Sequence, residues 1–389
     1  DLMETGDEDR VRIVEAAAPW QHIRPVGEDI VAGEMILPGH HKIRSIDVGV
    51  LLSAGITRIE VAARPRVAIF PTGTEIIEPE ETPVEGSIIE SNSRMFENLA
   101  VEQGAIADRF LVIPDDYGKI KEEIEWASQN YDVVLINAGS SAGTEDYTVH
   151  VLRELGEVVV HGVSIKPGKP VILAVVNKRP VIGLPGYPVS AYIGFENFVN
   201  PVLAMLGDTV CRKNPTVPAV ISKRLVSSLK HREYIRVKVG KVGEKLVAAP
   251  LARGAGAAMS MVRADGFCVI PQNSEGVEAG ETVQVELYRD LSKIENTLVV
   301  IGSHDLILDV IADQMPQIHR NMYLSSTHVG SMGGLMALKR REAHLAPTHL
   351  LDEKTGVYNI SYLKRLFTEP MVLIKGVGRI QGLMVKKGN

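Results

Sequence analysis

Residues 132–148 read DVVLINAGSSAGTEDYT, and this stretch decides the fold. It opens with an apolar, β-branched run, Val133 to Ile136, that is typical of a buried parallel strand. The turn that follows contains Gly139, Ser140 and Ser141, and a helix-like segment comes next. A buried strand that leads through a Gly/Ser loop into a helix presents backbone N–H groups to an anion. The stretch therefore predicts an α/β fold with an anion-binding loop.

A second stretch, residues 164–191, reads SIKPGKPVILAVVNKRPVIGLPGYPVSA. Lys166 and Lys169 lie on a loop that proline and glycine punctuate, and residues 180–183 form a second buried strand. That strand ends at another loop-to-helix junction around Gly186. Two such junctions, two lysines and nearby carboxylates predict a phosphate-bearing ligand with a metal ion.

Strand, loop and helix alternate throughout residues 64–207. This rhythm predicts a parallel sheet covered by helices on both faces. Ligands bind such sheets at the carboxyl ends of the strands, where the two loops above fall. The predicted strands are 66–70, 110–113, 132–136, 158–160 and 180–183, and the predicted helices are 92–103, 115–129, 146–155 and 187–206.

The alternation of strand, loop and helix stops on the C-terminal side of this region. Residues 208–292 hold short strand-like runs separated by glycine and polar turns, which predicts a small antiparallel β domain. Residues 297–389 contain the strand-like runs 298–301 and 323–327, each followed by a small-residue loop and a helix. This pattern predicts a further α/β region.

Composition excludes several classes of function. A net charge of −6 argues against nucleic-acid binding, which usually needs a basic face. Apolar runs stay shorter than a membrane span, and a signal peptide pattern is absent. The two cysteines, Cys211 and Cys268, make neither a metal-ligand spacing nor an evident disulfide framework. A cytoplasmic protein with no nucleic-acid or membrane partner is the expectation.

The sequences of these stretches resemble the motifs of one known family. They are similar to the motifs GGVSVGxxDYT, IKPGKP and GLPGNPVSA, and further matches occur at Gly27–Ile30, Val67–Glu75 and Ser91–Ser93. On these motifs the chain, over roughly residues 10–290, is identified as a member of the molybdopterin molybdenumtransferases, the MoeA and gephyrin E-domain family. The C-terminal region resembles one lobe of a periplasmic-binding-protein-like (PBP-like) domain of the LysR substrate-binding kind.

The resemblance implies a fold of several α/β and β domains. Expected are a remnant of the N-terminal linker and dimerisation region at 1–63, a doubly wound α/β domain of the MogA/MoaB type at 64–207, a small antiparallel β-barrel at 208–292 and a partial PBP-like lobe at 297–389. The family's N-terminal DNSAMDGYA-like motif is absent from this sequence. Since that region normally completes the partner's active site, turnover by this chain alone is expected to be poor.

The resemblance also implies a reaction, the Mg²⁺-dependent insertion of molybdate or tungstate into adenylylated molybdopterin with release of AMP, in a homodimer. The alternative is a non-catalytic sensor or scaffold that binds an oxyanion or molybdopterin. The implied catalytic residues are Glu75, Asp116 and Asp146, and the implied magnesium ligands are Glu75, Asp115 and Asp116. The implied substrate-binding residues are Gly139, Ser140, Ser141, Lys166, Lys169, Gly186, Ser190 and Arg236.

Each of these residue types also has an ordinary structural explanation. Carboxylates and serines at helix starts act as caps or complement the helix dipole, and exposed lysines and arginines are usually just solvated. Two departures from the family matter as well. Gly139-Ser140 stands where the family has Gly-Gly, and Tyr187 stands where it has asparagine. Side chains narrow a loop that cradles a ligand, so either serine hydroxyls take part in binding or the substrate differs in detail.

In the C-terminal region, Ser303 and Ser331 follow the two predicted strands. Loops after parallel strands lie at one edge, so we expect these serines to face one oxyanion or cofactor, with His304 and His328 as further donors. The basic run Lys339 to Arg341 is expected to face solvent. The alternative is that the serines merely cap helices.

Overall fold

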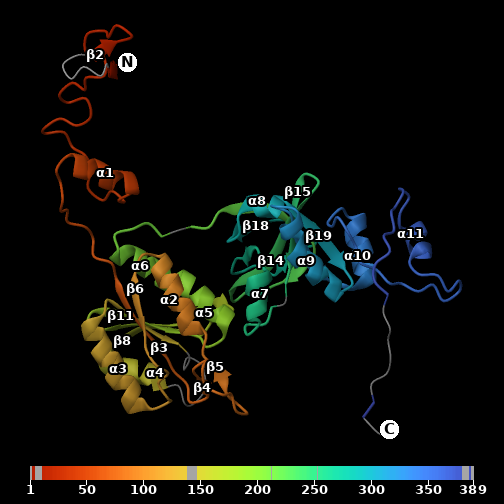
Figure 1. Ribbon diagram of the computed structural model, residues 1–389. Coiled ribbons are helices and arrows are strands. Elements are labelled where there is room, and N and C mark those ends of the chain that lie inside the picture. Colours follow the sequence, from red (N-terminus) through yellow and green to blue (C-terminus); the bar gives the residue numbers. More distant parts are fainter. Residues whose placement is uncertain are drawn as a thin grey trace. The chain divides into compact units, whose positions relative to one another are not determined.

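The computed structural model describes residues 2–4, 11–137, 147–211, 213–251, 253–378 and 385–386 (Figure 1). Residues 1–63 and residues 64–389 form two compact units. The first unit contains β1 (Leu2–Glu4), β2 (Val11–Ile13) and α1 (Ser45–Ser53). In α1, buried Asp47 accepts hydrogen bonds from the side chain and backbone of Arg44, and its carboxylate lies 2.7 Å from His41 Nε2. These contacts fix the start of the helix.

A six-stranded mixed sheet is the centre of the second unit's first half, with the order β6-β3-β7-β11-β10-β8. Its strands are β3 (Arg66–Pro71), β6 (Ile106–Arg109), β7 (Val133–Asn137), β8 (Gly156–His161), β10 (Ile172–Val176) and β11 (Arg179–Leu184). Every residue of β7 is buried. That burial explains why its sequence is continuously apolar up to the terminal asparagine.

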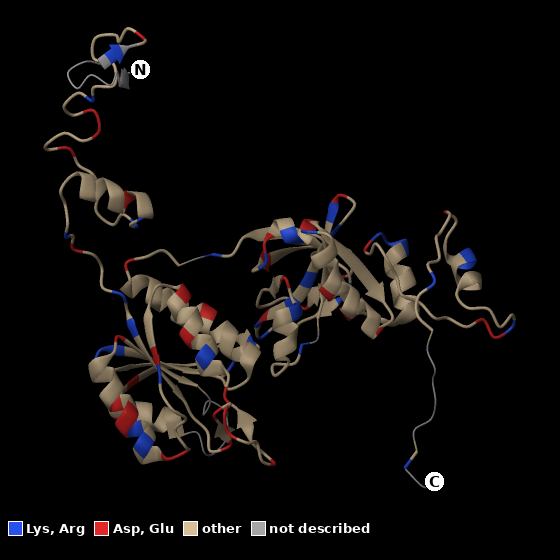
Figure 2. Ribbon diagram, in the orientation of Figure 1, with Lys and Arg blue, Asp and Glu red and all other residues tan. Residues whose placement is uncertain are grey.

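Helices cover both faces of this sheet (Figure 1). In α3, apolar residues at the helical spacing of Ile120, Ile124 and Ala127 pack onto one face, and Phe96 of α2 stacks with Phe195 on the other. The helices are α2 (Asn92–Glu102), α3 (Tyr117–Asn130), α4 (Tyr147–Leu155), α5 (Pro188–Gly194), a π-helical turn (Phe195–Val199) and α6 (Asn200–Leu206). Figure 2 shows that the exposed side of α3 carries charges of both signs.

Two details of the predicted sheet are wrong. The strand predicted at 110–113 lies earlier, at Ile106–Arg109, because Phe110 turns its ring onto Phe70 with 4.6 Å between centroids. A purely parallel sheet was also expected, but β10 and β11 form an antiparallel hairpin. The two-residue turn Asn177-Lys178 has positive φ at both positions, which matches the twist that favours hairpins.

The second half of the unit begins with a closed β-barrel, whose strands are β12 (Thr216–Ile221), β14 (Arg232–Val242), β15 (Lys245–Pro250), β16 (Gly266–Ile270) and β18 (Thr282–Leu287). The predicted antiparallel pairing holds except where β12 and β15 close the barrel in parallel. Ile235, Val237 and Val285 fill its core. Shorter elements are β13 (Leu225–Val226), β17 (Gly276–Val277), α7 (Ala258–Arg263) and α8 (Leu291–Glu295).

The lysine loop physically joins the α/β part to the barrel. Its short strand β9 (Ile165–Lys166) pairs in parallel with the start of β14, so that Lys166 stands opposite Glu233. Another small pair, β4 (Ile76–Ile77) and β5 (Ile88–Ile89), extends from the end of β3.

The C-terminal region contains a parallel pair, β19 (Thr297–Gly302) and β20 (Tyr323–His328). It packs on the barrel, because a Cβ placed on Gly240 of β14 would lie 2.1 Å from Val299. Its helices are α9 (Leu306–Ile318), α10 (Gly330–Lys339) and α11 (Ile360–Leu366). The helix predicted from residue 335 thus begins at Gly330. The strand expected after His344 is reduced to one bridge, between Leu345 and Val300.

Candidate functional site

Three parallel strands end together at what we call the carboxyl edge, the end of the sheet formed by the C-termini of β3, β7 and β11. Pro71, Asn137 and Leu184 stand in register there. Asn137 is buried, its carbonyl accepts the Thr72 N–H at 2.8 Å, and its side-chain amide donates to the Pro185 carbonyl at 3.0 Å. Asn137 therefore links the ends of the three strands, through its backbone carbonyl on one side and its side-chain amide on the other.

The loop after β3 carries the predicted metal ligand Glu75, which is exposed. Asp115 approaches this loop, because its Oδ2 accepts hydrogen bonds from the Thr74 N–H at 3.1 Å and from the Thr74 hydroxyl at 3.4 Å. Gly73 has φ +143°, a conformation that side chains disfavour, and a Cβ there would lie 3.2 Å from Glu75 Oε2. The structure therefore brings the Glu75 and Asp115 loops together.

Asp116 has a structural task at the same edge. Its Oδ1 accepts the Lys119 N–H at 3.0 Å and caps α3. Within the described ranges, no group of three or more His, Cys, Asp or Glu side chains is placed to hold a metal. Mg²⁺ is nevertheless compatible with Glu75 and Asp115, since it keeps several waters and uses one or two carboxylates plus substrate oxygens.

The Gly/Ser loop after β7 lies outside the described residues. Four predicted site residues fall in this segment, namely Gly139, Ser140, Ser141 and Asp146. Their roles stay predictions. The described residues on either side are Asn137, which ends β7, and Tyr147, which begins α4.

The lysine loop lies beside the start of α5. Lys166 and Lys169 are exposed, and Gly168 is buried. A Cβ on Gly168 would lie 3.5 Å from the Ser190 carbonyl and 2.9 Å from the Ile165 side chain. Gly168 has φ +115°, so both space and conformation call for glycine. The loop therefore approaches the α5 backbone closely at Ser190, through the glycine between its two lysines.

The junction before α5 is fixed by a hydrogen bond that the sequence prediction did not include. Asn92 at the start of α2 donates from its side chain to the Gly186 carbonyl at 2.7 Å. Gly186 is exposed, Ser190 is buried, and Tyr187 keeps 66% of its surface exposed at the helix start. Tyr187 provides no side-chain cap there, and its ring lies 3.3 Å from the position of a Cβ on Gly256.

Arg236 reaches the same junction from the barrel. It is buried on β14, and its Nη2 donates to the Gly254 carbonyl at 3.2 Å. Burial lowers the pKa of Arg236. The next residue of that loop, Ala255, accepts the Val189 N–H at 3.2 Å. The barrel loop that Arg236 holds at Gly254 therefore contacts the start of α5 at Val189, the residue before Ser190.

Family comparisons agree with this arrangement of domains. Residues 68–205 match a "Probable molybdopterin binding domain", residues 2–55 match the "MoeA N-terminal region (domain I and II)", and residues 218–288 match the "MoeA C-terminal region (domain IV)". A protein named for molybdopterin biosynthesis in Methanocaldococcus jannaschii is 33% identical over 290 residues, which cover 72% of this chain and 70% of that protein. The chain belongs to the MoeA family of molybdopterin biosynthesis proteins.

Other members of the MoeA family show the same extent of likeness. The molybdopterin molybdenumtransferase of Haemophilus influenzae is 27% identical over 289 residues, 74% of this chain and 72% of that enzyme. A solved MoeA structure from Pyrococcus horikoshii superposes with a TM-score of 0.57 at 34% identity and covers 68% of this chain. This chain spans 64% of that solved chain and 54% of the Nostoc molybdenumtransferase. The predicted fold class, an α/β multidomain protein with a small barrel, is confirmed.

The C-terminal region lies outside the residues that match the MoeA family models. Residues 312–389 match a "PBP superfamily domain", as the sequence predicted. The four domain limits given above stay predictions. Among the described residues, no helix is both long and apolar enough to cross a membrane.

Both serines predicted as C-terminal donors form hydrogen bonds with another segment of the same chain. The Ser303 N–H donates to the Pro347 carbonyl at 2.9 Å. The buried Ser331 hydroxyl accepts the His349 N–H at 3.1 Å and lies 3.3 Å from His349 Nδ1. The rings of His304 and His328 are in edge-to-face contact. The oxyanion site stays a prediction, whereas the exposure of Lys339 to Arg341 is as expected.

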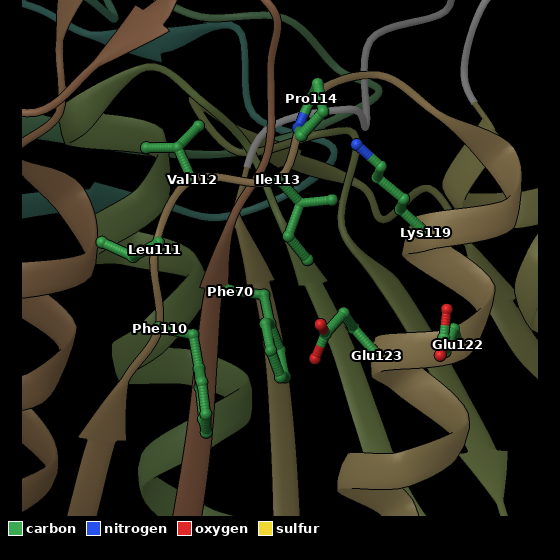
Figure 3. A pocket seen from close by; sticks show the side chains of 9 residues that line it. All are labelled: Phe70, Phe110, Leu111, Val112, Ile113, Pro114, Lys119, Glu122 and Glu123. Atoms are coloured by element: carbon green, nitrogen blue, oxygen red, sulfur yellow. The ribbon is translucent and has the colours of Figure 1, made fainter.

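A cavity of about 330 Å³ lies beside the carboxyl edge (Figure 3). Phe70 and Phe110 line its floor, and Lys119, Glu122 and Glu123 line it from α3. In Figure 3 the Lys119 side chain points towards Pro114, the residue just before Asp115. The cavity is largely apolar at its base and does not contain the lysine loop or Arg236. We therefore place the candidate site at the carboxyl edge and the α5 junction rather than here.

Proposed function

We propose that this chain inserts molybdate into adenylylated molybdopterin and releases AMP. The observation that carries the proposal is that two loops meet the start of α5, next to an edge where three parallel strands end. The lysine loop approaches Ser190, and the barrel loop held by Arg236 contacts Val189. Phosphate and oxyanion groups bind where cations and backbone N–H groups gather at such an edge. The molybdenumtransferase names of relatives support the same reaction.

The chain's own residues would act by positioning and by neutralising charge. Lys166 and Lys169 would contact the pyrophosphate as point charges. Ser190 and Arg236 would donate to the anionic groups of the substrate, and the buried guanidinium would do so in surroundings where water screens it little. Asn137 and Asn92 would keep the backbone of the edge in place by their hydrogen bonds to Pro185 and Gly186.

Magnesium fits the oxygen-rich loops at this edge. Glu75 and Asp115 would hold it, with Asp116 as a further candidate, and a bound Mg²⁺ would offset phosphate charge. Glu75→Gln should then lose Mg²⁺-dependent AMP release without loss of fold. AMP release that persists in wild type after removal of all divalent ions would assign these carboxylates to another role.

We further propose that the protein works as a homodimer in the cytoplasm. The resemblance supports the dimer, because the family's N-terminal region completes the partner's site. Light scattering coupled to size-exclusion chromatography would measure the mass of the assembly. A monomer at micromolar concentration would contradict the proposal.

One assay separates the proposed enzyme from a sensor or scaffold. Adenylylated molybdopterin is mixed with the protein, with and without molybdate, and AMP is quantified over time. The proposal predicts AMP that accumulates with the protein and increases with molybdate. Substrate binding without AMP in the presence of both molybdate and Mg²⁺ would support the scaffold instead. Running the assay with tungstate compares the two oxyanions.

A further inference from the structure

A buried carboxylate lies at the point where the lysine loop meets the barrel. Glu233 on β14 has a side chain only 3% exposed. Its Oε1 lies 3.5 Å from Lys166 Nζ and 3.4 Å from Arg253 Nη1. Its Oε2 accepts a hydrogen bond from the Ser227 hydroxyl at 2.9 Å. One carboxylate thus holds two cations that come from different domains of the unit.

The two cations reach solvent, while the anion between them does not. The Lys166 side chain is 53% exposed and that of Arg253 is 38% exposed. Two positive groups around one buried negative group leave a net positive charge at the surface. An ion pair that only joined the two domains would need one cation. The second cation therefore indicates a further role.

Arg253 is anchored so that part of its guanidinium remains available. Its Nη1 donates to the Val226 carbonyl at 2.6 Å and faces Glu233. Its Nε and Nη2 make no hydrogen bond to another residue in the described part of the chain. A planar guanidinium held at one corner can offer its other N–H groups to two oxygens of one phosphate.

The loop that carries Arg253 also covers the start of α5. Gly254 receives the bond from Arg236, and Ala255 accepts the Val189 N–H. Arg253 therefore stands on the same short loop that contacts the Ser190 region, and it shares Glu233 with the lysine loop. This position makes it a neighbour of the groups to which we have assigned the substrate's phosphates.

We propose that Arg253 is a phosphate-contacting residue that the barrel supplies, and that Glu233 is a positioning residue that holds Arg253 and Lys166 side by side. The ligand class is a pyrophosphate-bearing compound. The inference rests on the proposed function and extends it, because it assigns part of the phosphate site to the barrel. Arg236 is the only residue of this domain that the sequence predicts in the site.

Calorimetry with inorganic pyrophosphate tests the role of Arg253. Arg253→Ala should weaken pyrophosphate binding about tenfold at low salt, because one charge-assisted hydrogen-bonding group is lost. Arg253→Lys should recover only part of that loss, since an ammonium lacks the planar fork. Arg224→Ala is the matched control, because Arg224 is an exposed barrel arginine paired with Glu278 at 2.9 Å. Unchanged binding by Arg253→Ala would overturn the assignment.

Glu233→Gln separates positioning from simple charge. It removes a negative group beside two cations, so charge alone predicts tighter pyrophosphate binding. Positioning predicts weaker binding, by about threefold to tenfold, because the cations lose their common anchor. Ser227→Ala keeps the charge of Glu233 but removes a hydrogen bond to its carboxylate. It should therefore also weaken pyrophosphate binding, by less than Glu233→Gln does. Tighter binding by Glu233→Gln, or unchanged binding by a folded Ser227→Ala, would overturn the positioning role.

The outcomes distinguish this inference from the proposed function. Loss of pyrophosphate binding in Lys166→Ala but not in Arg253→Ala overturns the inference and leaves the proposed reaction standing. Failure of the wild-type protein to bind pyrophosphate overturns the inference. Failure of the AMP assay as well would overturn the proposed function.

Discussion

The carboxyl edge of the α/β sheet and the end of the β19–β20 pair are built from the same local unit, a parallel strand followed by a small-residue loop and a helix. At the carboxyl edge, asparagine side chains hold the loop backbones, and the lysine loop and the barrel loop held by Arg236 approach the adjoining start of α5. At the β19–β20 end, Ser303 and Ser331 bond to the adjoining chain at 347–349. The comparison teaches that a strand, loop and helix in the sequence predict the fold. Contacts with other parts of the chain decide whether the hydrogen-bond donors of the loop remain available to a ligand.

The largest effect is expected at the lysine loop. Lys169→Ala should weaken binding of adenylylated molybdopterin about 10-fold to 100-fold at low salt, because it removes an exposed cation that we propose contacts the phosphates. Its melting temperature should stay the same. Lys293→Ala, an exposed lysine on α8, serves as the control. Equal affinity in both variants would take Lys169 out of the site.

Asn137 should matter for stability at the same edge. Asn137→Ala leaves the buried Pro185 carbonyl without its donor, which should lower the free energy of unfolding by about 1–3 kcal/mol. Denaturant unfolding measures this change. Asn98→Ala is a suitable control, because the Asn98 amide bonds only to its own helix at an exposed position. A loss no larger than that of the control would show that the Asn137 side chain does not stabilise the end of β11.

The C-terminal region should differ from the α/β sheet in its response to acid. Partial desolvation of its imidazole lowers the pKa of His344, although the residue reaches solvent, and its Nδ1 accepts the Val299 N–H at 3.0 Å. Burial, followed by the neighbouring His304, also lowers the pKa of His328. The unfolded imidazole titrates near 6.5, so unfolding takes up protons below that pH. The stability that these histidines contribute is thus present above about pH 6.5 and is lost as pH falls below it.

Amide hydrogen exchange at pH 7.5 and 5.5, corrected for intrinsic rates, would measure this difference. Protection in α10 should fall at the lower pH by more than protection in α2. His344→Gln should flatten the response, because a glutamine oxygen accepts the Val299 N–H at either pH. Equal protection of α10 at both values in wild type would contradict the assigned role of His344.

The smallest effect is expected at Ser331. Ser331→Ala removes one hydroxyl that bonds to His349, so the C-terminal region should lose about 1 kcal/mol. If the Ser331 hydroxyl only bonds to His349 and does not bind a ligand, calorimetric titrations with molybdate and sulfate should be the same for wild type and variant. Loss of oxyanion binding in a folded Ser331→Ala protein would instead support the predicted C-terminal oxyanion site.

Much of the architecture could be predicted from sequence because local patterns carry it. The apolar run that becomes β7 and the Pro/Gly-punctuated loop with its two lysines are visible without a structure. The Asn177-Lys178 hairpin was missed although its turn residues signal it, because the alternating α/β pattern favoured parallel strands throughout.

The rest of the site depends on contacts between distant parts of the chain. Lys166 meets Glu233 only because β9 joins the barrel sheet, and Asn92 meets Gly186 only because α2 packs beside the end of β11. Such pairings leave no periodic trace in the sequence. Asn137 had a weak signal, a polar residue that closes a buried strand, but its bond to Pro185 requires the register of β7 with β11.

The most direct test of the central claim is a crystal structure with adenylylated molybdopterin and tungstate, in which anomalous scattering locates the metal. The account predicts the pyrophosphate beside Lys166 and Lys169 and the tungsten peak near the start of α5. An anomalous peak at the end of the β19–β20 pair, beside Ser303 and Ser331, with the lysine loop free of ligand, would contradict it.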